Sequence, residues 1–338
     1  MLAAILVEPN RIEIQEIETP KPSKGEVLVK IKTALTCGTD LKAFLRGHPM
    51  IPMPGPFGHE FSGIISDVGR GVKGFKAGDE IMAVHSAPCL KCRYCRKKLY
   101  NLCENIMNTK VLGAFAEYIL LPSNIVKQNL FYKPESLSFE DAAFLEPLSC
   151  VVHGMREINI RRGDKVLIIG TGPIGLLHLP LTKLKGAEVI ITGLELERLV
   201  IAKGLGADAA IEPSELVNAV KEFTGGIGVD LVFECTGHLD VWEKSVNYVR
   251  RGGTVVLFGG VKTGTVVTYD TCRLHYDEIT LKGVFHFTQK DVKEAYELLS
   301  GTTINVSPMI SGHYPLNELH IALDRLSRGE GIKYAIVP

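Results

Sequence analysis

The chain has 338 residues, which at roughly 150 residues per domain predicts about two domains, each able to bury its own core. Lys plus Arg and Asp plus Glu both number 38, so no net positive field exists to hold nucleic acid or an anionic membrane surface. Apolar residues make up 46% and charged residues 22%, as in folded proteins, and no stretch reaches the ~18 apolar residues of a membrane helix. We therefore expect a small-molecule substrate and no nucleic-acid or membrane partner.

The first half of the chain, up to about residue 150, alternates short β-like runs with Gly and Pro. Its opening run lacks a basic segment and a small-residue cleavage site, which predicts a cytoplasmic protein. The main β-like runs are EVLVKIKTAL, FSGIISDVG, DEIMAVHS and AEYILLP. Turn residues separate them. This half predicts an irregular, mostly antiparallel β domain.

Four of the eight cysteines lie close together in this half, with the spacing C-x2-C-x2-C-x7-C: Cys89, Cys92, Cys95 and Cys103. Four thiolates from one loop can surround a tetrahedral zinc ion, and such a closed site is structural. A free thiol cluster and an iron–sulfur site are the alternatives. The loop is also basic, which leaves a nucleic-acid-binding zinc module as a third alternative, although the neutral chain favours a solvated loop.

After about residue 160, short apolar runs alternate with helical stretches. The strand-like runs are KVLIIG, EVIIT, DAAI, VDLVFECTG and GGTVVLFG. This alternation indicates βαβ units and a parallel sheet covered on both faces. DEITLKGVFHF predicts the last strand of that sheet, and two helical patterns follow it. The ending IKYAIVP is strand-like, and either sheet could hold it.

A glycine-rich turn lies between the first of these strands and a helix. It has G-x-G-x-x-G spacing in the sequence GTGPIG: Gly170, Gly172, Pro173, Ile174 and Gly175. The first glycine suits the tight turn, the second lets backbone amides reach a pyrophosphate, and the third allows close helix packing. In this strand, turn and helix context, the motif predicts a dinucleotide site.

The residue that usually reads the adenine ribose is an acid about 20 residues further on. Here that position is Gly193, with Glu195 and Arg198 close by. Either a nearby glutamate binds the NAD ribose, or Arg198 binds the phosphate of NADP. The sequence leaves both cofactors open.

A second set of candidate metal ligands is spread over the β-rich half. Cys37 and the adjacent His59 and Glu60 supply the composition of a catalytic zinc site, in which few protein ligands leave a position for water or substrate. From spacing alone, a core cysteine and a hydrogen-bonded histidine are the commoner meanings.

The order of short motifs along nearly the whole chain resembles the zinc-containing medium-chain alcohol dehydrogenases. The Glu146-Pro147-Leu148 segment is similar to that of the polyol (sorbitol-type) and threonine dehydrogenase branch. The matching segments are Cys37-Gly38-Thr39-Asp40, Gly58-His59-Glu60, Gly78-Asp79, the four-cysteine loop, Glu146-Pro147-Leu148, GTGPIG and Glu234-Cys235-Thr236-Gly237.

The resemblance implies an α/β fold of two domains. A GroES-like, mostly β catalytic domain would comprise residues 1–148 and 288–338, and a Rossmann NAD(P)-binding domain of residues 149–287 would be inserted between them. It also implies a homo-oligomer, expected to be a tetramer.

The resemblance further implies roles for individual residues. Cys37 and His59 match the catalytic zinc ligands, and Glu60 and Glu146 match acids that bind zinc or its water. Thr39 matches a hydroxyl that carries the substrate proton, and Thr236 lies where the family contacts nicotinamide. A histidine common in this branch is replaced by Lys42. Lys42 either takes its place in the proton relay through a water or the cofactor ribose or, as we favour, is a surface lysine.

The expected activity is the zinc-dependent transfer of a hydride between a secondary alcohol, such as a polyol, sugar acid or related sugar-derived alcohol, and NAD or NADP. Two zinc ions per chain are expected. The alternatives within this chemistry are an L-threonine 3-dehydrogenase and a simple secondary-alcohol dehydrogenase. A zinc-free quinone or enoyl reductase, or a non-catalytic cofactor-binding protein, would be expected to lack the candidate ligands at residues 37, 59, 60 and 146.

Overall fold

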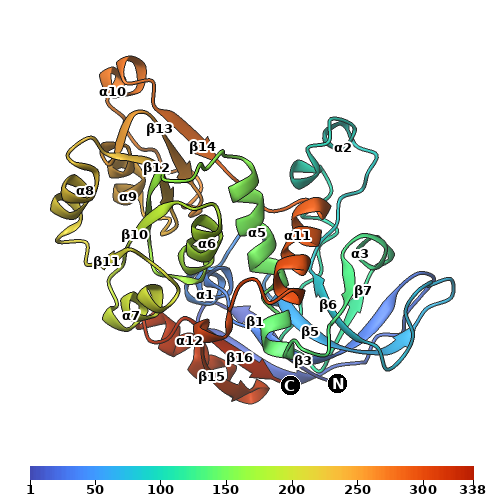
Figure 1. Cartoon of the computed structure of the whole chain (residues 1–338). Helices are drawn as coiled ribbons and strands as arrows, with labels where there is room; N and C mark the ends of the chain where they lie inside the picture. The colour runs from blue at the N-terminus through green and yellow to red at the C-terminus, as the bar shows by residue number, and fades with distance from the viewer. The chain divides into compact units, whose positions relative to one another are not determined.

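The computed structural model describes all 338 residues, and their contacts divide the chain into two units (Figure 1). Unit 1 comprises Met1–Cys150 and Phe287–Pro338, and unit 2 comprises Val151–His286. Unit 2 is therefore an insertion in the chain of unit 1. No helix in either unit has the length and apolar character needed to cross a bilayer.

Unit 1 is built on a seven-stranded sheet with the order β15-β16-β3-β5-β6-β8, in which β7 also pairs with β3. All neighbours are antiparallel except β15 and β16. A three-stranded sheet, β2-β1-β4, accompanies it. The strands are β1 (Leu2–Glu8), β2 (Arg11–Glu16), β3 (Val27–Leu35), β4 (Gly55–Pro56), β5 (Glu60–Val68), β6 (Glu80–Val84), β7 (Tyr118–Leu121), β8 (Leu130–Tyr132), β15 (Ile310–Pro315) and β16 (Lys333–Val337).

The central strand β3 shows why this half folds as a sheet. Its Val29 and Ile31 are buried, whereas Lys30 and Lys32 between and after them are exposed. This period of two places one face of the strand in the core. The predicted antiparallel β domain is thus confirmed.

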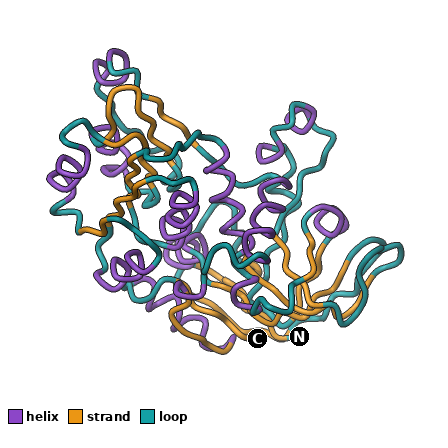
Figure 2. The backbone as a smooth tube through the Cα atoms, in the orientation of Figure 1, coloured by secondary structure: helices purple, strands orange, loops and turns teal.

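Helices lie between and after these strands, as the colouring of Figure 2 shows. Helix α11 begins with a capping box: the side chain of Thr288 accepts a hydrogen bond from the backbone of Asp291, and the side chain of Asp291 accepts one from the backbone of Thr288. The helices are α1 (Gly38–Arg46), α2 (Arg93–Arg96), α3 (Ser123–Gln128), α4 (Phe139–Ala142), α11 (Gln289–Ser300) and α12 (Leu319–Ser327), with 3-10 turns at Tyr100–Leu102, Ser307–Met309 and Leu316–Glu318. Helix α5 (Leu145–Arg156) carries the chain from unit 1 into unit 2.

The final strand answers the question that the sequence left open. β16 pairs antiparallel with β3, with Ala335 opposite Leu35 and Ile336 opposite Ala34. The chain therefore returns to the first sheet after the inserted unit, and β16 reaches the end of β3 where the candidate metal ligands begin.

Unit 2 is a six-stranded, fully parallel sheet with the order β11-β10-β9-β12-β13-β14. The strands β10 and β11 follow β9 on one side of the sheet, and β12, β13 and β14 are then added on its other side. The direction in which strands are added therefore reverses between β9 and β12. This is the doubly wound topology, whose ligands bind at that reversal. The elements are β9 (Lys165–Ile169), α6 (Pro173–Leu184), β10 (Glu188–Thr192), α7 (Leu196–Gly204), β11 (Ala209–Ile211), α8 (Leu216–Thr224), β12 (Val229–Glu234), α9 (Leu239–Lys244), a 3-10 turn (Ser245–Asn247), β13 (Val249–Leu257), α10 (Thr271–Tyr276) and β14 (Thr280–Gly283).

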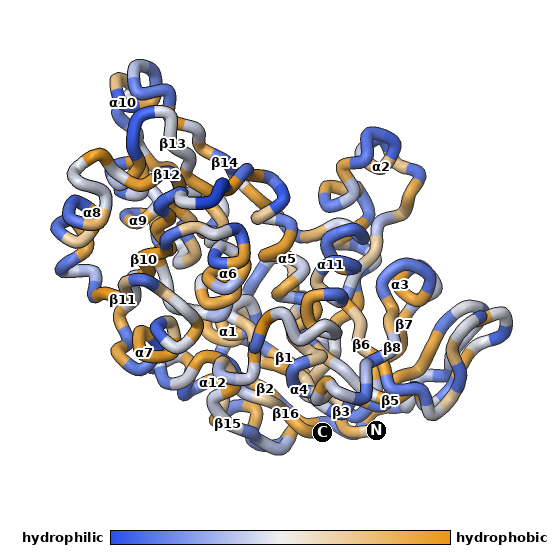
Figure 3. Tube along the Cα trace, viewed as in Figure 1, coloured by the Kyte–Doolittle hydropathy of each residue, from blue (hydrophilic) through white to orange (hydrophobic).

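The inner strands of unit 2 are apolar along their whole length. Val166, Leu167 and Ile168 of β9 have no exposed surface, which is expected when helices cover both faces of a parallel sheet. The hydropathy colouring of Figure 3 shows β10 as hydrophobic in the same way. The α/β fold expected from the sequence is thus confirmed.

Candidate active site

Three candidate ligands of unit 1 meet at one point. Cys37, His59 and Glu60 each offer one donor atom, and these atoms lie within 4.8 Å of one another. We call these three residues the metal group. They meet because β3 and β5 pair with Leu35 opposite Glu60, so the chain leaving β3 reaches Cys37 beside the start of β5.

Cys37 is held at the beginning of a helix. It is the N-cap of α1, and its Sγ accepts a hydrogen bond from the backbone N–H of Thr39 at 3.4 Å. The N-terminal end of a helix favours negative charge, so this position suits a thiolate ligand. Thr39 follows Cys37 by two residues and lies in the first turn of the same helix.

The imidazole of His59 is oriented by a carboxylate that the sequence did not single out. Asp40 has no exposed surface, and its Oδ1 lies 3.2 Å from Nδ1 of His59. Burial alone would lower the pKa of His59, but the Asp40 carboxylate and the Cys37 thiol beside it together outweigh burial and raise that pKa well above its usual value. A carboxylate on one ring nitrogen leaves the other nitrogen for a metal. Asp40 follows Cys37 by three residues and therefore shares its end of α1.

Glu60 is held by a lysine from the last strand. Nζ of Lys333 donates hydrogen bonds to Oε2 of Glu60 and, at 2.9 Å, to the carbonyl oxygen of Thr36. Burial raises the pKa of Glu60, although the Lys333 ammonium opposes this shift. The other carboxylate oxygen, Oε1, is buried without a hydrogen-bond partner. Glu60 therefore has one oxygen anchored and one available to a cation.

The donors of the metal group fit a zinc ion. A thiolate, an imidazole and a carboxylate are all common zinc ligands, and three protein ligands leave a fourth position for substrate or water. The buried Oε1 of Glu60 without a partner is the kind of atom that a bound cation would satisfy.

Glu146, expected to bind zinc or its water, lies outside the three residues of the metal group but interacts electrostatically with His59 and Glu60. It lies in the first turn of α5, is 6% exposed, and has its Oε1 3.4 Å from Nδ1 of His85. Cys150, one turn further along α5, donates its thiol to the same oxygen at 3.7 Å. Burial raises the pKa of Glu146 to about 7. The sequence assigned His85 no role, because a lone histidine after a strand carries no spacing signal.

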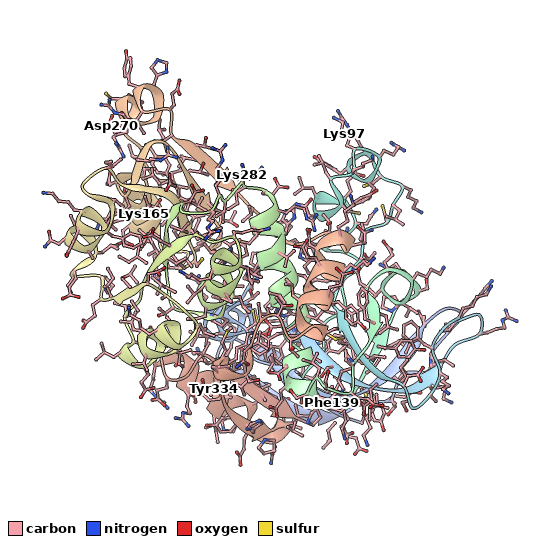
Figure 4. All side chains as sticks on the ribbon, viewed as in Figure 1. Lys97, Phe139, Lys165, Asp270, Lys282 and Tyr334 are labelled. Carbon is pink, nitrogen blue, oxygen red and sulfur yellow. The ribbon has the colours of Figure 1, made fainter.

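The four clustered cysteines also meet, and we call them the cysteine cluster. All four sulfurs lie within 4.8 Å of one another, and no cysteine of the chain is in a disulfide. The sulfurs of Cys89 and Cys95 are 4.0 Å apart, and those of Cys92 and Cys103 are 3.9 Å apart. Four sulfurs around zinc at about 2.3 Å would be about 3.8 Å apart. The cluster therefore fits a tetrahedral zinc ion, while Lys97 of the same loop is exposed (Figure 4).

The predicted dinucleotide turn of unit 2 has the required close packing. A Cβ on Gly175 would lie 1.9 Å from the carbonyl oxygen of Gly170, so only glycine fits there. Gly172 is the N-cap of α6, Pro173 and Ile174 begin the helix, and no side chain caps its amides. A Cβ on Gly172 would meet nothing within 4 Å. The open N-terminus of this 12-residue helix fits a pyrophosphate.

The end of β10 explains the missing acid. A Cβ on Gly193 would lie 2.0 Å from Oγ1 of Thr171, so this threonine occupies the space that an aspartate would need. Glu195 and Arg198 form an ion pair at 3.3 Å. Thr236 donates its hydroxyl to Glu234 at the end of β12.

Together, a zinc-fitting donor set and a doubly wound sheet with an open glycine turn define a metal-dependent oxidoreductase that uses a dinucleotide. Residues 23–130 match the family described as alcohol dehydrogenase GroES-like domain, and residues 173–301 match the zinc-binding dehydrogenases. The chain belongs to the zinc-binding alcohol dehydrogenase family, which uses zinc and a nicotinamide cofactor.

Individual relatives extend over nearly the whole chain. Sorbitol dehydrogenase of Halalkalibacterium halodurans is 32% identical over 96% of this chain and 95% of its own length. D-arabitol-phosphate dehydrogenase of Enterococcus avium is 33% identical over 95% of this chain and 92% of its own. The crystal structure of a zinc-binding dehydrogenase from Sinorhizobium meliloti 1021 bound to NADP is similar with a TM-score of 0.89 and 30% identity, covering 100% of this chain and 99% of that one.

Proposed function

We propose that this dehydrogenase oxidises a secondary hydroxyl of a polyol or related sugar-derived alcohol, and reduces the corresponding ketone, with NAD or NADP as the second substrate. The observation that carries the proposal is the metal group, in which three zinc-type donors meet and one carboxylate oxygen has no partner. Unit 1 is the proposed catalytic domain and unit 2 the proposed cofactor domain. The sorbitol and arabitol-phosphate relatives support a polyol as substrate.

In this proposal Cys37, His59 and Glu60 hold the zinc ion, and the turn from Gly170 to Gly175 holds the pyrophosphate of the cofactor. When bound, zinc supplies a Lewis acid that lowers the pKa of the substrate hydroxyl, and nicotinamide supplies the hydride acceptor.

The chain's own residues then have distinct tasks. Asp40 keeps the ring of His59 oriented through the Nδ1 contact at 3.2 Å. Lys333 keeps one oxygen of Glu60 fixed, while the other, which has no hydrogen-bond partner, stays available to the zinc ion. Thr39, in the first turn of α1, would accept the proton that the substrate hydroxyl loses while its own hydroxyl proton passes to solvent.

The cysteine cluster has a different proposed task. Because its four thiols would fill all positions around a zinc ion, that ion would be structural and would stabilise the loop. We further propose a cytoplasmic homotetramer, supported by the resemblance to polyol and threonine dehydrogenases. Sedimentation equilibrium of the purified protein tests the tetramer.

A substrate panel tests the proposed activity. The zinc-loaded protein is assayed with sorbitol, xylitol, a sugar acid, L-threonine and butan-2-ol, each with NAD and with NADP, and its zinc content is measured. We expect about two zinc ions per chain and the highest kcat/KM on a polyol. Highest activity on L-threonine or on butan-2-ol would replace the polyol by that substrate, and a zinc-loaded protein without turnover on any alcohol would refute the proposal.

A further inference from the structure

His85 is a buried histidine beside the metal group that the mechanism above does not use. It follows the last residue of β6, is 7% exposed, and its carbonyl oxygen accepts the N–H of Val111 at 2.8 Å. Its ring meets the ring of His59 edge to face, with centroids 5.1 Å apart, and the ring of Phe287 at 6.0 Å. The imidazole is therefore fixed in place between a metal-group residue and an aromatic ring.

Glu146 gives this imidazole a polar partner. Its Oε1 lies 3.4 Å from Nδ1 of His85, and both side chains are buried. A buried imidazole beside a carboxylate is costly to maintain if it serves packing alone, since an apolar side chain would fill the same space without desolvation. The pair thus places hydrogen-bonding groups next to the metal group without belonging to it.

The chemistry of this pair suits a hydroxyl group. A hydroxyl is both donor and acceptor, and an imidazole oriented by a carboxylate can complement it in either sense. The metal group would bind the reacting oxygen of an alcohol, and a residue that contacts the group, as His85 contacts His59, is placed to meet an oxygen on an adjacent carbon. Polyols carry such a vicinal hydroxyl, whereas simple secondary alcohols do not.

We propose that His85, oriented by Glu146, binds the hydroxyl next to the reacting one and makes the enzyme selective for vicinal diols over mono-alcohols. This inference rests on the proposed function, because it requires an alcohol bound at the metal group. Sites built to hydrogen-bond a substrate hydroxyl discriminate strongly against analogues that lack it, since their own buried polar groups are then left unpaired.

The test compares two substrates in four forms of the zinc-loaded protein. The substrates are the best vicinal diol among sorbitol, xylitol and butane-2,3-diol, and butan-2-ol. The forms are wild type, His85→Phe, His85→Asn and the control His320→Phe, which changes an exposed histidine of α12 in the same unit. Zinc content and the Kd of NADH are measured for each form, independently of turnover.

We expect wild type to prefer the diol, and His85→Phe to lower kcat/KM for the diol at least about tenfold more than for butan-2-ol, which corresponds to one lost hydrogen bond of about 1.4 kcal/mol. His85→Asn should restore part of the preference, and His320→Phe should leave it unchanged. Zinc content and NADH affinity should stay at the wild-type level in every form.

Equal losses on both substrates, or a loss of zinc in His85→Phe, would overturn the specificity role, as would a wild type that prefers butan-2-ol. These results differ from failure of the proposed function, in which the wild type would oxidise neither substrate.

Discussion

Lys333 and Glu60 lie 273 positions apart in the chain and form a buried ion pair, with exposures of 1% and 0% for their side chains. The pair connects the last strand of unit 1 to the metal group, because Glu60 shares that group with Cys37 and His59. The carboxylate is thus held by a part of the sheet that the chain completes only after the inserted unit.

Replacing this lysine should damage both stability and metal binding. Lys333→Met leaves Glu60 buried without its cation, and breaking a buried pair in this way costs roughly 3–5 kcal/mol. We expect a lower melting temperature and a faster loss of zinc to a chelator. Lys333→Arg should recover most of both, and Lys293→Met, on the exposed face of α11, should change neither. Unchanged zinc release in Lys333→Met would contradict the positioning role.

Removing the thiol of the metal group should separate catalysis from cofactor binding. Cys37→Ser is expected to lower kcat by at least about a thousandfold, since a Lewis acid supplies several kcal/mol of charge stabilisation. The Kd of NADH, measured by fluorescence, should stay within about twofold of wild type because the glycine turn lies in unit 2. Cys272→Ser, at an exposed cysteine, is the matched control. Retained turnover in Cys37→Ser would exclude Cys37 as a required ligand.

Removing a thiol of the cysteine cluster should act on stability instead. Cys92→Ser is expected to lower the zinc content by one ion per chain. It should also lower the melting temperature by about 5–10 °C, because structural zinc contributes directly to folding free energy. Zinc analysis and calorimetry measure the two effects. If both quantities stay at wild-type values, the cluster is a set of free thiols.

A buried histidine of unit 2 should make stability depend on pH. His178 has no exposed surface, its Nδ1 lies 2.8 Å from the carbonyl oxygen of Ile174, and its ring packs on Phe233 at 4.2 Å. Burial lowers its pKa from 6.5 to about 4. Between these values the unfolded chain binds more protons than the folded one, so stability falls as the pH drops from about 6.5 towards 4.

The size of this effect can be isolated with a variant. From pH 7 to pH 5 the wild type should lose about 2 kcal/mol more unfolding free energy than His178→Leu, which cannot take up the proton. Urea unfolding followed by the fluorescence of Trp242, the single tryptophan and a residue of unit 2, measures this difference. His275→Leu, at an exposed position of α10, should behave as wild type. If the unfolding free energies of wild type and His178→Leu change equally with pH, His178 is not held in its neutral form by burial.

Short-range patterns of the sequence predicted most of the fold. The alternation in β3 and the strand, turn and helix around GTGPIG are local signals, and the structure confirms both the antiparallel sheet and the doubly wound sheet. The four-cysteine spacing is local too, and its sulfurs do meet. Such patterns are readable because a single turn or strand places the residues together.

The remainder of the site depends on contacts that no local pattern reveals. Lys333 meets Glu60 only because β16 pairs with β3, and His85 meets Glu146 only because β6 ends beside the start of α5. Spacing cannot encode either register. Asp40 is the exception: it was named only as part of a matching segment, but an acid three residues after a candidate N-cap ligand lies on the same turn of helix and could have been assigned to the site.

The late position of β16 has a consequence for how the metal group is assembled. β3 and β5 are synthesised long before β16, and the sequence separation of the Lys333–Glu60 pair makes it one of the most non-local contacts of the molecule. Contacts of this kind form slowly, because the intervening chain must be ordered first. A newly made chain therefore holds its Glu60 carboxylate without a counter-ion until the last sheet strand docks, and a metal ion that arrives before that moment meets an unfinished site.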